Sequence, residues 1–443
     1  MSTTGGSSTE RLADPFPVMP IGPPLDATVT LPGSRSITNR ALLCAALADG
    51  TSRLRGVLFA DDTEAMIESL GRLGVPIEAD RARGSVTVAG RSGRFGGTDE
   101  TLDARLSGTT SRFLAPLLSL SPTPTRLDGA EPLRARPMQG VFEALRVLGA
   151  VVEEVAQPGH LPADISRGAG TGTSEVRLAA DVSSQFASGL LLSAPARPDG
   201  LVVRLDGPIV SQPYLDMTVA VMAKFGARVD RPDERTYLVA PTGYRSTDFA
   251  VEPDASTASY FFAAAAVVGG RVRVGGLSAD SLQGDAGFVD VLEQMGAGVE
   301  RGADFLEVRR TGTLHGVTAD FSQISDTAQT LAAVAVFADS PTEVTGIGFI
   351  RRKETDRIAA VVTELRRCGI DASETDDGFR ILPGQPQPAT IRTYDDHRMA
   401  MSFAVLGLRA PGIQIADPGC VAKTFPGFWA ALDDLRTGSL GGQ

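Results

Sequence analysis

SLGRLGVPIE, residues 69–78, joins the end of an apolar helical stripe to a glycine and a short strand. This pattern is the main indication of the fold. It returns as ALRVLGAVVE (144–153), VMAKFGARVD (221–230), VLEQMGAGVE (291–300) and ELRRCGIDAS (364–373). The shared glycines are spaced by 75, 77, 70 and 73 residues, and a left-handed glycine commonly ends a helix. A further helix, FWAALDDLR (428–436), has the same character. The chain is therefore predicted to contain six similar α/β units.

A second kind of helix alternates with the first and is rich in Ala and Leu on most faces. Its copies are TNRALLCAALADG, TSRFLAPLLSL, VSSQFASGLLLSAP, ASTASYFFAAAAVVGG, DTAQTLAAVAVFADS and DHRMAMSFAVLGL. A helix that is apolar all round is a buried one, so each unit should carry one buried helix, one amphipathic helix and short strands. The units could form a closed ring, an open solenoid or two globules of three.

Each buried helix begins with polar residues, such as Ser36, Arg112 or Gln185. Helix N-termini present unpaired backbone N–H groups and attract anions. If these helix ends converge in the fold, they form an anion-binding surface. The repeat therefore leads to a functional prediction, a site that binds anions.

The composition excludes several classes of protein. The formal net charge is −11, whereas nucleic-acid binding needs a broad basic surface. The apolar run around residues 260–268 is too short to span a bilayer, and the first residues lack the features of a signal peptide. We expect a cytoplasmic protein with a disordered tail over about residues 1–13. Its cysteines, Cys44, Cys368 and Cys420, have no metal-ligand spacing.

Glycine, hydroxyl and arginine side chains gather at the start of two buried helices. They belong to LPGSRSITNR (31–40) and to LSGTTSRF (106–113), where Gly108 allows close backbone approach. A capped helix with solvated arginines explains the first segment equally well. Arg136, just before Pro137, is expected in the first turn of an amphipathic helix. The helix dipole disfavours a cation there, so a bound anion would explain it.

Charged residues gather in three later segments. RRKETDR puts Lys353, Glu354 and Arg357 close together, although a solvated, salt-bridged helix start is the alternative. Asp326 in ISDTAQT is either an N-cap or a general base. His397 in DDHRMAMSF is one of three histidines, and such a residue is more often structural than catalytic. Lysine occurs at only three positions, and two of them lie in RRKETDR and AKTFPGF, which favours a functional role.

Together these segments resemble the EPSP synthase family. LPGSRSITNRALL, DGAEPLRARPM, VSSQF, VSQPY, DASTASYF, RRKETDR, TYDDHRMAMSF and AKTFP stand in the family's order, from about Leu31 to Leu435. The resemblance implies an inside-out α/β barrel of two globular domains, each of three βαβαββ units, with ligands in the cleft between them. It implies a lower domain of residues 1–33 plus 252–443 and an upper domain of residues 34–251.

The activity that the resemblance implies is transfer of the enolpyruvyl group of phosphoenolpyruvate to the 5-hydroxyl of shikimate 3-phosphate. The products are 5-enolpyruvylshikimate 3-phosphate and phosphate, in the shikimate pathway to chorismate and the aromatic amino acids. No metal or organic cofactor is implied. Glyphosate is an expected inhibitor because it occupies the phosphoenolpyruvate site of the family. We further expect a monomer that binds neither nucleic acid nor membranes.

The family's binding residues carry over onto matching positions. Those implied for shikimate 3-phosphate are Ser36, Arg40, Ser183, Ser184, Gln185, Ser211, Tyr214, Asp326 and Lys353. Those implied for phosphoenolpyruvate are Arg35, Gly108, Thr109, Arg112, Arg136, Gln185, Arg357, His397, Arg398 and Lys423.

The implied catalytic residues are Asp326, Glu354 and Lys353. Glu354 resembles the residue that protonates the methylene carbon, and Asp326 the one that takes the hydroxyl proton. Opposite tasks require environments that push the pKa values of the two carboxyls apart.

Three positions depart from the family pattern. Arg35 stands where the family usually has Lys, and Leu106 and Phe349 each replace a common Asn. Lys can give up its proton when buried and Arg cannot, so Arg35 is expected to hold charge rather than to shuttle protons.

Two other functions remain open. The related UDP-N-acetylglucosamine enolpyruvyl transferases share the fold and the donor, but they generally use a Cys in the first third of the chain. Here no Cys lies between Cys44 and Cys368, and the shikimate-type SSQ and SQPY segments are present. A non-catalytic binding paralogue is the second alternative, and the intact set of Asp326, Glu354 and Lys353 disfavours it.

Overall fold

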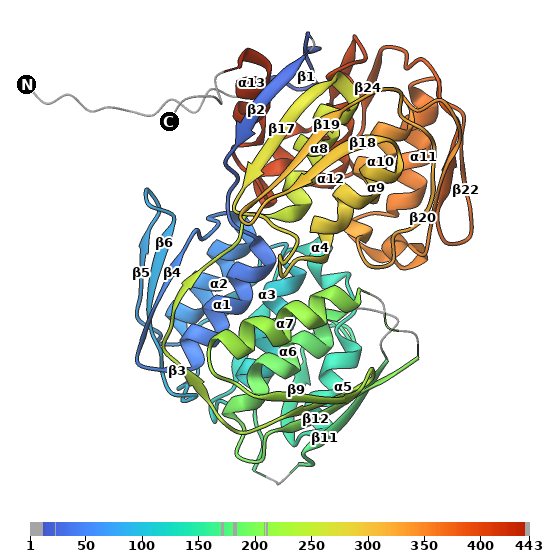
Figure 1. The fold of residues 1–443 in the computed structure, drawn as a ribbon. Helices are drawn as coiled ribbons and strands as arrows, with labels where there is room; N and C mark the ends of the chain where they lie inside the picture. The colour runs from blue at the N-terminus through green and yellow to red at the C-terminus, as the bar shows by residue number, and fades with distance from the viewer. Residues whose placement is uncertain are drawn as a thin grey trace, which may run out of the picture.

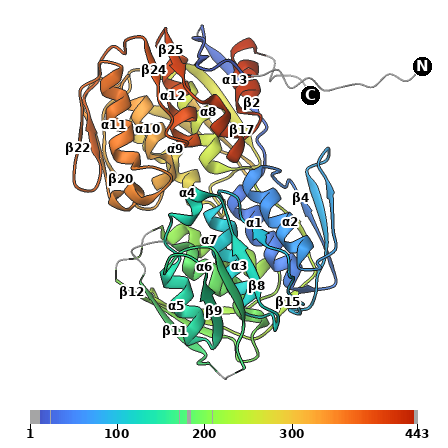
Figure 2. The same cartoon turned by 180° about the vertical axis from the view of Figure 1, so that it is seen from behind.

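The computed structural model describes residues 12–22, 24–169, 172–179, 184–207, 209 and 211–438. Most of the expected N-terminal tail, residues 1–11, lies outside this range, and so does Ser183. Figures 1 and 2 show two bodies joined end to end. In each body the sheets lie on the outside and the helices lie inside, between the sheets. We call residues 35–251 the inserted body, and residues 12–29 with 255–438 the terminal body.

One sheet topology recurs in both bodies. In the described part of the inserted body, three four-stranded sheets have the orders β16 (Asp248–Ala250)–β4 (Thr51–Arg55)–β6 (Ser85–Ala89)–β5 (Ile77–Asp80), β7 (Leu102–Asp103)–β8 (Thr125–Asp128)–β10 (Ala163–Arg167)–β9 (Ala150–Glu154), and β11 (Glu175–Ala179)–β12 (Leu201–Asp206)–β14 (Thr236–Val239)–β13 (Val229–Asp233). The first two strands of each sheet are parallel and the remaining pairs are antiparallel. A small sheet pairs β3 (Ala48–Asp49) with β15 (Tyr244–Arg245).

The terminal body repeats this arrangement with one incomplete copy. Its sheets are β2 (Leu25–Val29)–β17 (Gly270–Gly275)–β19 (Phe305–Arg310)–β18 (Ala297–Arg301), β20 (Thr318–Asp320)–β21 (Thr342–Thr345)–β23 (Phe379–Ile381)–β22 (Ala372–Glu374), and β24 (Ala389–Ile391)–β25 (Ile413–Ile415)–β1 (Phe16–Pro17). In the last sheet β1, from the N-terminal segment, pairs antiparallel with β25. The sixth unit is therefore completed by the start of the chain.

Two sets of helices lie inside these sheets, as the repeat predicts. The buried set is α1 (Arg35–Leu47), α3 (Gly108–Leu118), α6 (Ser184–Ser193), α8 (Ala255–Val268), α10 (Ala328–Ala335) and α12 (His397–Gly407). The amphipathic set is α2 (Asp61–Arg72), α5 (Gln139–Val147), α7 (Gln212–Lys224), α9 (Phe288–Gln294), α11 (Arg357–Arg367) and α13 (Phe428–Thr437). The repeat glycines after α2, α5, α7, α9 and α11 all have positive φ, between 75° and 98°, which confirms them as helix stops.

Short helices fill the connections and correct one expectation. They are α4 (Glu131–Arg134), η1 (Ala194–Ala196), η2 (Gly284–Gly287), η3 (Ser325–Thr327), η4 (Gly348–Arg352) and η5 (Pro418–Lys423). Arg136 lies between α4 and α5 and not in the first turn of an amphipathic helix. The physical reason is Pro137, because a residue before proline is disfavoured in helical conformation.

The chain crosses between the two bodies twice, and the crossings lie side by side. Gly33 and Pro253 form an antiparallel bridge. The Ser34 amide donates to the Glu252 carbonyl at 2.7 Å, and the Asp254 amide to the Pro32 carbonyl at 3.0 Å. The first crossing leads from β2 to α1 and the second from β16 to α8. Each crossing thus separates a strand from the helix that follows it in the repeat.

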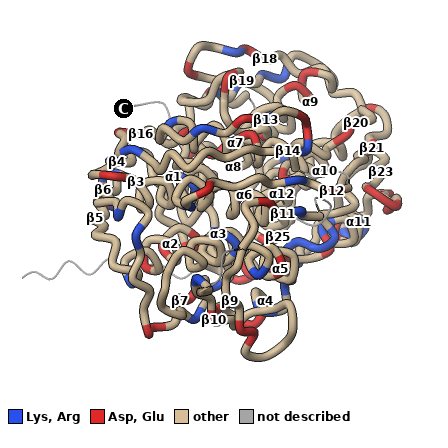
Figure 3. The backbone as a smooth tube through the Cα atoms, turned by 90° about the horizontal axis from the view of Figure 1, so that it is seen from below, with Lys and Arg blue, Asp and Glu red and all other residues tan. Residues whose placement is uncertain are grey.

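Each body has its own hydrophobic cluster. One contains buried residues between Ile37 and Val251, and the other combines Val18–Leu31 with Ala255–Leu435. The independence of the bodies as domains, with boundaries at 33/34 and 251/252, stays a prediction. No helix in the described ranges is long and apolar enough to cross a membrane. Figure 3 shows basic and acidic residues interspersed along the backbone, without a face of one sign.

Candidate functional site

The N-terminal ends of five buried helices converge on one pocket between the bodies. The pocket is lined by Arg35, Ser36, Arg40, Thr109, Arg136, Ser184, Gln185, Ser211, Tyr214, Asp326, Lys353, Glu354, Arg357 and Arg398. α1, the starts of α3, α6 and α12, and η3, which leads into α10, supply part of this lining. The remainder comes from the segment before α5, the start of α7, the segment after η4 and the start of α11. The expected convergence of the polar helix starts is confirmed, and all of these lining residues were candidate site residues, whereas anion binding there stays a prediction. The helix ends and arginines suit a ligand with several negative charges.

Arg40 on α1 is a buried cation of the inserted body. Its Nε donates to Thr218 Oγ1 at 2.8 Å, its Nη1 to the Ser36 carbonyl at 2.9 Å and its Nη2 to the Tyr214 carbonyl at 3.1 Å. Burial lowers the pKa of Arg40 to about 10, so it stays charged at neutral pH. Within the described chain it has no carboxylate partner. A buried cation without a counter-ion favours binding of an anion.

Arg112 and Arg136 are two more arginines of this wall that lack a carboxylate partner in the described chain. Arg112 Nη1 donates to Gln185 Oε1 at 2.6 Å and Nη2 to the Pro137 carbonyl at 3.3 Å. Burial, followed by the charge of Arg136, lowers the pKa of Arg112 to about 9. A Cβ on Gly108 would lie 2.9 Å from Nη1 of Arg136, so only glycine leaves Arg136 room over the start of α3. Neither arginine pairs with a carboxylate among the residues described.

Hydroxyl and amide groups complete the wall of the inserted body. Gln185 Nε2 donates to Thr109 Oγ1 at 2.9 Å, which ties the starts of α6 and α3 together. Ser211 precedes α7 with φ 57° and ψ 44°, a left-handed conformation that is uncommon for serine. Such strain is typical of functional sites. Of the predicted serines, Ser36, Ser184 and Ser211 line the pocket, whereas Ser183 lies outside the described residues.

Asp326 stands on the opposite wall and contacts both bodies. Its Oδ1 accepts from Arg357 at 2.9 Å, and its Oδ2 accepts from Arg398 at 2.7 Å and from the Tyr214 hydroxyl at 2.9 Å. It caps no helix, so the N-cap alternative is wrong. Burial alone would raise the pKa of Asp326, but the charges of Arg398 and Arg357 hold it well below its usual value. Asp326 is therefore an ionised carboxylate at neutral pH.

Glu354 is the second carboxylate of this wall. It accepts from Arg357 Nη2 and from Lys423 Nζ, both at 2.9 Å. Burial would raise its pKa, but Lys423, Arg357 and Arg136 together hold the pKa of Glu354 well below its usual value. The expectation that the pKa values of Asp326 and Glu354 are pushed apart is wrong for the unliganded protein. Both pKa values fall because each carboxylate faces cations, first Arg398 for Asp326 and Lys423 for Glu354, and then Arg357, which they share.

Lys353 lies between the two carboxylates and makes no ion pair in the described structure. Its Nζ lies 5.9 Å from the ring centroid of Phe349, one of the positions that departs from the family pattern. Burial lowers the pKa of Lys353 to about 8, against the opposing charge of Asp326. An ammonium group with such a pKa can give up a proton near neutral pH.

Arg35 bridges the two walls at the first crossing. Its Nη1 pairs with Asp62 Oδ2 at 2.9 Å, and its backbone N–H faces Asp254 Oδ2 at 3.4 Å. Burial would lower its pKa, but Asp62 raises the pKa of Arg35 overall. Arg35 thus keeps its charge, in agreement with the static role inferred from its identity.

His397 and two acidic residues complete the surroundings. His397 is buried at the start of α12 and does not line the pocket. Neither ring nitrogen makes a hydrogen bond in the described structure, and Nδ1 lies 3.8 Å from Asp396 Oδ1. Burial, followed by Arg398 and Lys423, holds the pKa of His397 well below its usual value, so it is neutral. The sequence analysis did not assign roles to Asp62 and Asp396. Asp396 accepts from Arg357 Nε at 2.7 Å and fixes that guanidinium.

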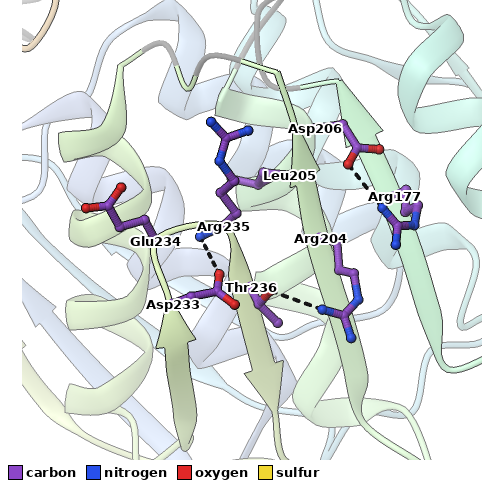
Figure 4. A pocket seen from close by; sticks show the side chains of 8 residues that line it. All are labelled: Arg177, Arg204, Leu205, Asp206, Asp233, Glu234, Arg235 and Thr236. Carbon is purple, nitrogen blue, oxygen red and sulfur yellow. Dashed lines mark hydrogen bonds and ion pairs between the residues drawn. The ribbon is translucent and has the colours of Figure 1, made fainter.

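A larger surface cavity of about 450 Å³ lies elsewhere, on the sheet β11–β12–β14–β13. Figure 4 shows its side chains on exposed strands, with Arg177 facing Asp206 and the Arg235 amide facing Asp233. Two of its arginines already form ion pairs, Arg177 with Asp206 and Arg204 with Glu175, and we assign no function to this cavity. In the described ranges no group of His, Cys, Asp and Glu side chains could hold a metal ion.

Comparisons with known proteins agree with this site. Helices enclosed by sheets, with anion-binding helix ends between two bodies, define the enolpyruvyl transferase class. The family model described as EPSP synthase (3-phosphoshikimate 1-carboxyvinyltransferase) matches residues 20–432. The chain belongs to this family.

Relatives and solved structures cover nearly the whole chain. The 3-phosphoshikimate 1-carboxyvinyltransferase of Nostoc punctiforme is 45% identical, over 94% of this chain and 98% of the relative. That of Methanoculleus marisnigri is 44% identical, over 92% and 96%. The EPSP synthase structure from Acinetobacter baumannii has a TM-score of 0.82 at 27% identity, over 95% of this chain and 97% of that one. The enolpyruvyl transferase NikO from Streptomyces tendae, 20% identical with a TM-score of 0.73 over 94% and 96%, shares the fold.

Proposed function

We propose that this chain transfers the enolpyruvyl group of phosphoenolpyruvate to the 5-hydroxyl of shikimate 3-phosphate in the pocket between its two bodies. It is an enzyme of the shikimate pathway, as its family membership and its relatives over nearly the whole chain indicate. The observation that carries the assignment of the pocket is the pair Asp326 and Glu354. These carboxylates share Arg357 and lie among cations and helix N-termini.

The wall of the inserted body suits shikimate 3-phosphate. Arg40 with the hydroxyls of Ser36, Ser184 and Ser211 offers a cation and donors for a phosphate, and Gln185 offers an amide. Tyr214 of the same wall, with Asp326 and Lys353 across the pocket, completes the site and would receive the ring hydroxyls. Ser183, next to Ser184 in the chain, belongs to the same proposal.

Phosphoenolpyruvate is proposed to bind deeper, between Arg136 and Arg112 of one body and Arg357, Arg398 and Lys423 of the other. Arg35, Gly108, Thr109 and His397 belong to the same subsite. Its carboxylate and phosphate carry the charges that these side chains complement. Because glyphosate is also an anion, we propose that it competes at this subsite.

The two carboxylates divide the proton transfers. Asp326 is ionised and takes the 5-hydroxyl proton as that oxygen forms its bond to C2 of phosphoenolpyruvate. Glu354 must first gain a proton. Bound phosphoenolpyruvate favours this, because its negative charges offset those of Arg357 and Lys423, which otherwise keep Glu354 ionised. Protonated Glu354 then delivers the proton to C3. From the tetrahedral intermediate the C–O bond to phosphate breaks, C3 loses a proton to Glu354, and phosphate leaves.

The ligands would also bring the bodies together. Arg40 and Gln185 belong to the inserted body, and Asp326 and Lys353 belong to the terminal body. A ligand that bridges two bodies shifts the population toward the closed arrangement. We propose a monomer that closes in this way, and its cytoplasmic location stays a prediction.

Phosphate release with phosphoenolpyruvate and each acceptor separately tests the function. We expect release with shikimate 3-phosphate and none with UDP-N-acetylglucosamine. Release with the nucleotide sugar alone would instead indicate the related transferase. Release with neither acceptor, together with retained binding of shikimate 3-phosphate, would indicate a non-catalytic binding protein.

A further inference from the structure

A loop of the terminal body clasps the second crossing between the bodies. We call residues 281–285 the crossing loop. The Ser281 hydroxyl donates to Glu252 Oε2 at 2.6 Å, and the Leu282 amide donates to both Glu252 oxygens at 3.1 Å. Gln283 Nε2 donates to the Pro253 carbonyl at 2.7 Å, and its Oε1 accepts from the first amide of α8, that of Ala255, at 3.0 Å. The loop therefore fixes the crossing to the start of α8.

The end of this loop borders a small cavity between the two bodies. The cavity, of about 10 Å³, is lined by Ser34, Ser36, Pro213, Tyr214, Met217, Asp254, Ser256, Gln283, Gly284, Asp285 and Gln323. Ser36 and Tyr214 also line the proposed substrate pocket. A Cβ on Gly284 would lie 2.6 Å from Pro213, so the loop touches the start of α7 in the other body. Asp285 therefore lines a cavity that shares Ser36 and Tyr214 with the substrate pocket, at the contact between the two bodies.

Asp285 has few partners for a buried carboxyl. It is 6% exposed, and among the described residues Ser256 alone donates a hydrogen bond to it, at Oδ2. Asp326, by contrast, accepts from two arginines and from Tyr214. A buried ionised carboxylate needs a paired cation or several donors. The surroundings of Asp285 thus suit a carboxyl that carries its proton.

The charges around Asp285 favour the same protonation state. Burial, followed by the negative charge of Asp326, raises the pKa of Asp285 to about 7, against the opposing charge of Arg398. Asp254 before α8 adds a further negative charge. Tyr214 of α7 is neutral, since burial and the charge of Asp285 raise its pKa. Asp290 of α9, the remaining neighbouring helix, pairs instead with Arg301.

We propose that Asp285 is a positioning residue that holds the closed arrangement of the two bodies while it carries a proton. In the protonated state it lies behind Tyr214 and Ser36 without adding negative charge beside Asp326 and the bound phosphate. When it ionises, it repels Asp326 and the anionic ligand across the boundary between the bodies. The proposal rests on the proposed function, because the ligand that closes the bodies is shikimate 3-phosphate.

The direction of the pH effect follows from proton linkage. The contact between the bodies, which Tyr214 and Asp326 already make without ligand, buries Asp285 and raises its affinity for a proton, so separation of the bodies releases a proton wherever the open form is ionised and the closed form is not. Closure and ligand affinity therefore weaken as pH rises from the ordinary carboxyl range to about 7. Above a pH of about 7 Asp285 is ionised in both forms, and the free-energy cost of closure no longer changes with pH.

Binding of shikimate 3-phosphate to the full-length protein and to Asp285→Asn, measured by calorimetry from pH 5.5 to 8.5, tests this. Asn mimics the protonated carboxyl, and the ratio of the two dissociation constants removes the titration of the ligand's own phosphate. We expect the ratio of the wild-type dissociation constant to that of the variant to rise about tenfold from pH 5.5 to about 7 and to stay constant at higher pH. Asp280→Asn, an exposed change in the adjacent turn, is the matched control and should give a ratio independent of pH.

Two results would overturn the proposal. One is a pH-independent ratio for Asp285→Asn, which would make Asp285 a merely structural residue. The other comes from thermal unfolding of the unliganded proteins, followed by the fluorescence of Trp429 in the terminal body. The wild-type midpoint should fall relative to Asp285→Asn as pH rises to about 7, because the folded carboxyl has the raised pKa. A constant difference contradicts the proposal even if shikimate 3-phosphate fails to bind, a failure that would count against the proposed function instead.

Discussion

The two walls of the pocket carry positive charge in different ways. On the wall of the inserted body, Arg40, Arg112 and Arg136 have no carboxylate partner among the described residues. On the wall of the terminal body, Arg357 and Arg398 are paired with carboxylates at 2.7–2.9 Å, and Lys423 with Glu354 at 2.9 Å. The positive charge of the first wall is not neutralised within the described chain, so its counter-charge must come from a ligand. The second is neutralised internally, so a ligand there changes the protonation and contacts of groups that already have partners.

This difference predicts that removing a cation has opposite consequences on the two walls. On the terminal wall it leaves buried carboxylates without a partner, and the folded state is destabilised. On the inserted wall it removes an uncompensated charge, so affinity is lost while stability is kept. The following experiments test this difference between the two walls.

The largest effect is expected for Arg357→Leu. Its guanidinium contacts Asp326, Glu354 and Asp396, and Asp396 is fully buried. Loss of the cation should cost about 3–5 kcal/mol of folding free energy. Urea unfolding followed by Trp429 fluorescence measures this, because Trp429 lies in α13 of the terminal body. Arg352→Leu, an exposed neighbour, is the control, and an equal loss in both variants would contradict the prediction.

Next in size are the losses of turnover in Asp326→Asn and Glu354→Gln. Each variant keeps the shape of the side chain but removes a proton-transfer group, so kcat should fall by about 10² or more. Circular dichroism should remain that of the wild type. Asp356→Asn is the matched control, because Asp356 is a true N-cap and Asn caps equally well. Unchanged turnover in Asp326→Asn would remove Asp326 from the mechanism.

Arg136→Met tests the inserted wall. No described hydrogen bond is lost, so the unfolding free energy measured by circular dichroism should stay within about 1 kcal/mol of the wild-type value. Phosphoenolpyruvate should bind roughly 10–100-fold more weakly, the scale of one charge-assisted contact. Arg134→Met, which removes an exposed pair with Asp128, should leave that affinity unchanged. A large loss of stability in Arg136→Met would erase the contrast between the walls.

The smallest effect is expected for Arg35→Lys. Arg35 pairs with Asp62 within the inserted body, and Lys can keep that pair and its charge. Activity should stay within about tenfold of wild type, about 1.4 kcal/mol, whereas Arg35→Ala should weaken phosphoenolpyruvate binding strongly. Steady-state constants across pH give the comparison. An inactive wild-type protein that Arg35→Lys restores would instead mark a disabled site.

Residues governed by local rules could be predicted from the sequence. The repeat glycines end their helices because a left-handed residue is needed there, and that requirement is visible in the spacing. The polar starts of the buried helices likewise foretold the convergence on one pocket. The family resemblance then gave the inside-out barrel, which the repeat alone left open.

Other features depend on groups that are distant in the chain. Whether Asp326 caps a helix or pairs with arginines depends on Arg357 and Arg398, which lie 31 and 72 residues away. The lowered pKa of Glu354 likewise depends on Lys423, at a separation of 69 residues. Asp285 carried no sequence signal, because burial and a neighbouring charge, both set by the tertiary fold, distinguish it from other aspartates. Arg136 was misplaced because Pro137 disfavours a helical conformation at the residue before it, so α5 begins only at Gln139.

The exchange of strands between the ends of the chain has a consequence for biosynthesis. Strand β2 pairs with β17, and Asp26 contacts Arg271 across a separation of 245 residues. At a ribosomal rate of about 5–20 residues per second, β2 waits roughly 12–50 seconds for its partner to be synthesised. The inserted body emerges complete during that interval, while β2 and β1 remain as unpaired edges open to association with other nascent chains. Translation pauses between β2 and β17 should therefore lower the yield of folded protein more than pauses after β17, because they prolong the time for which β2 is unpaired.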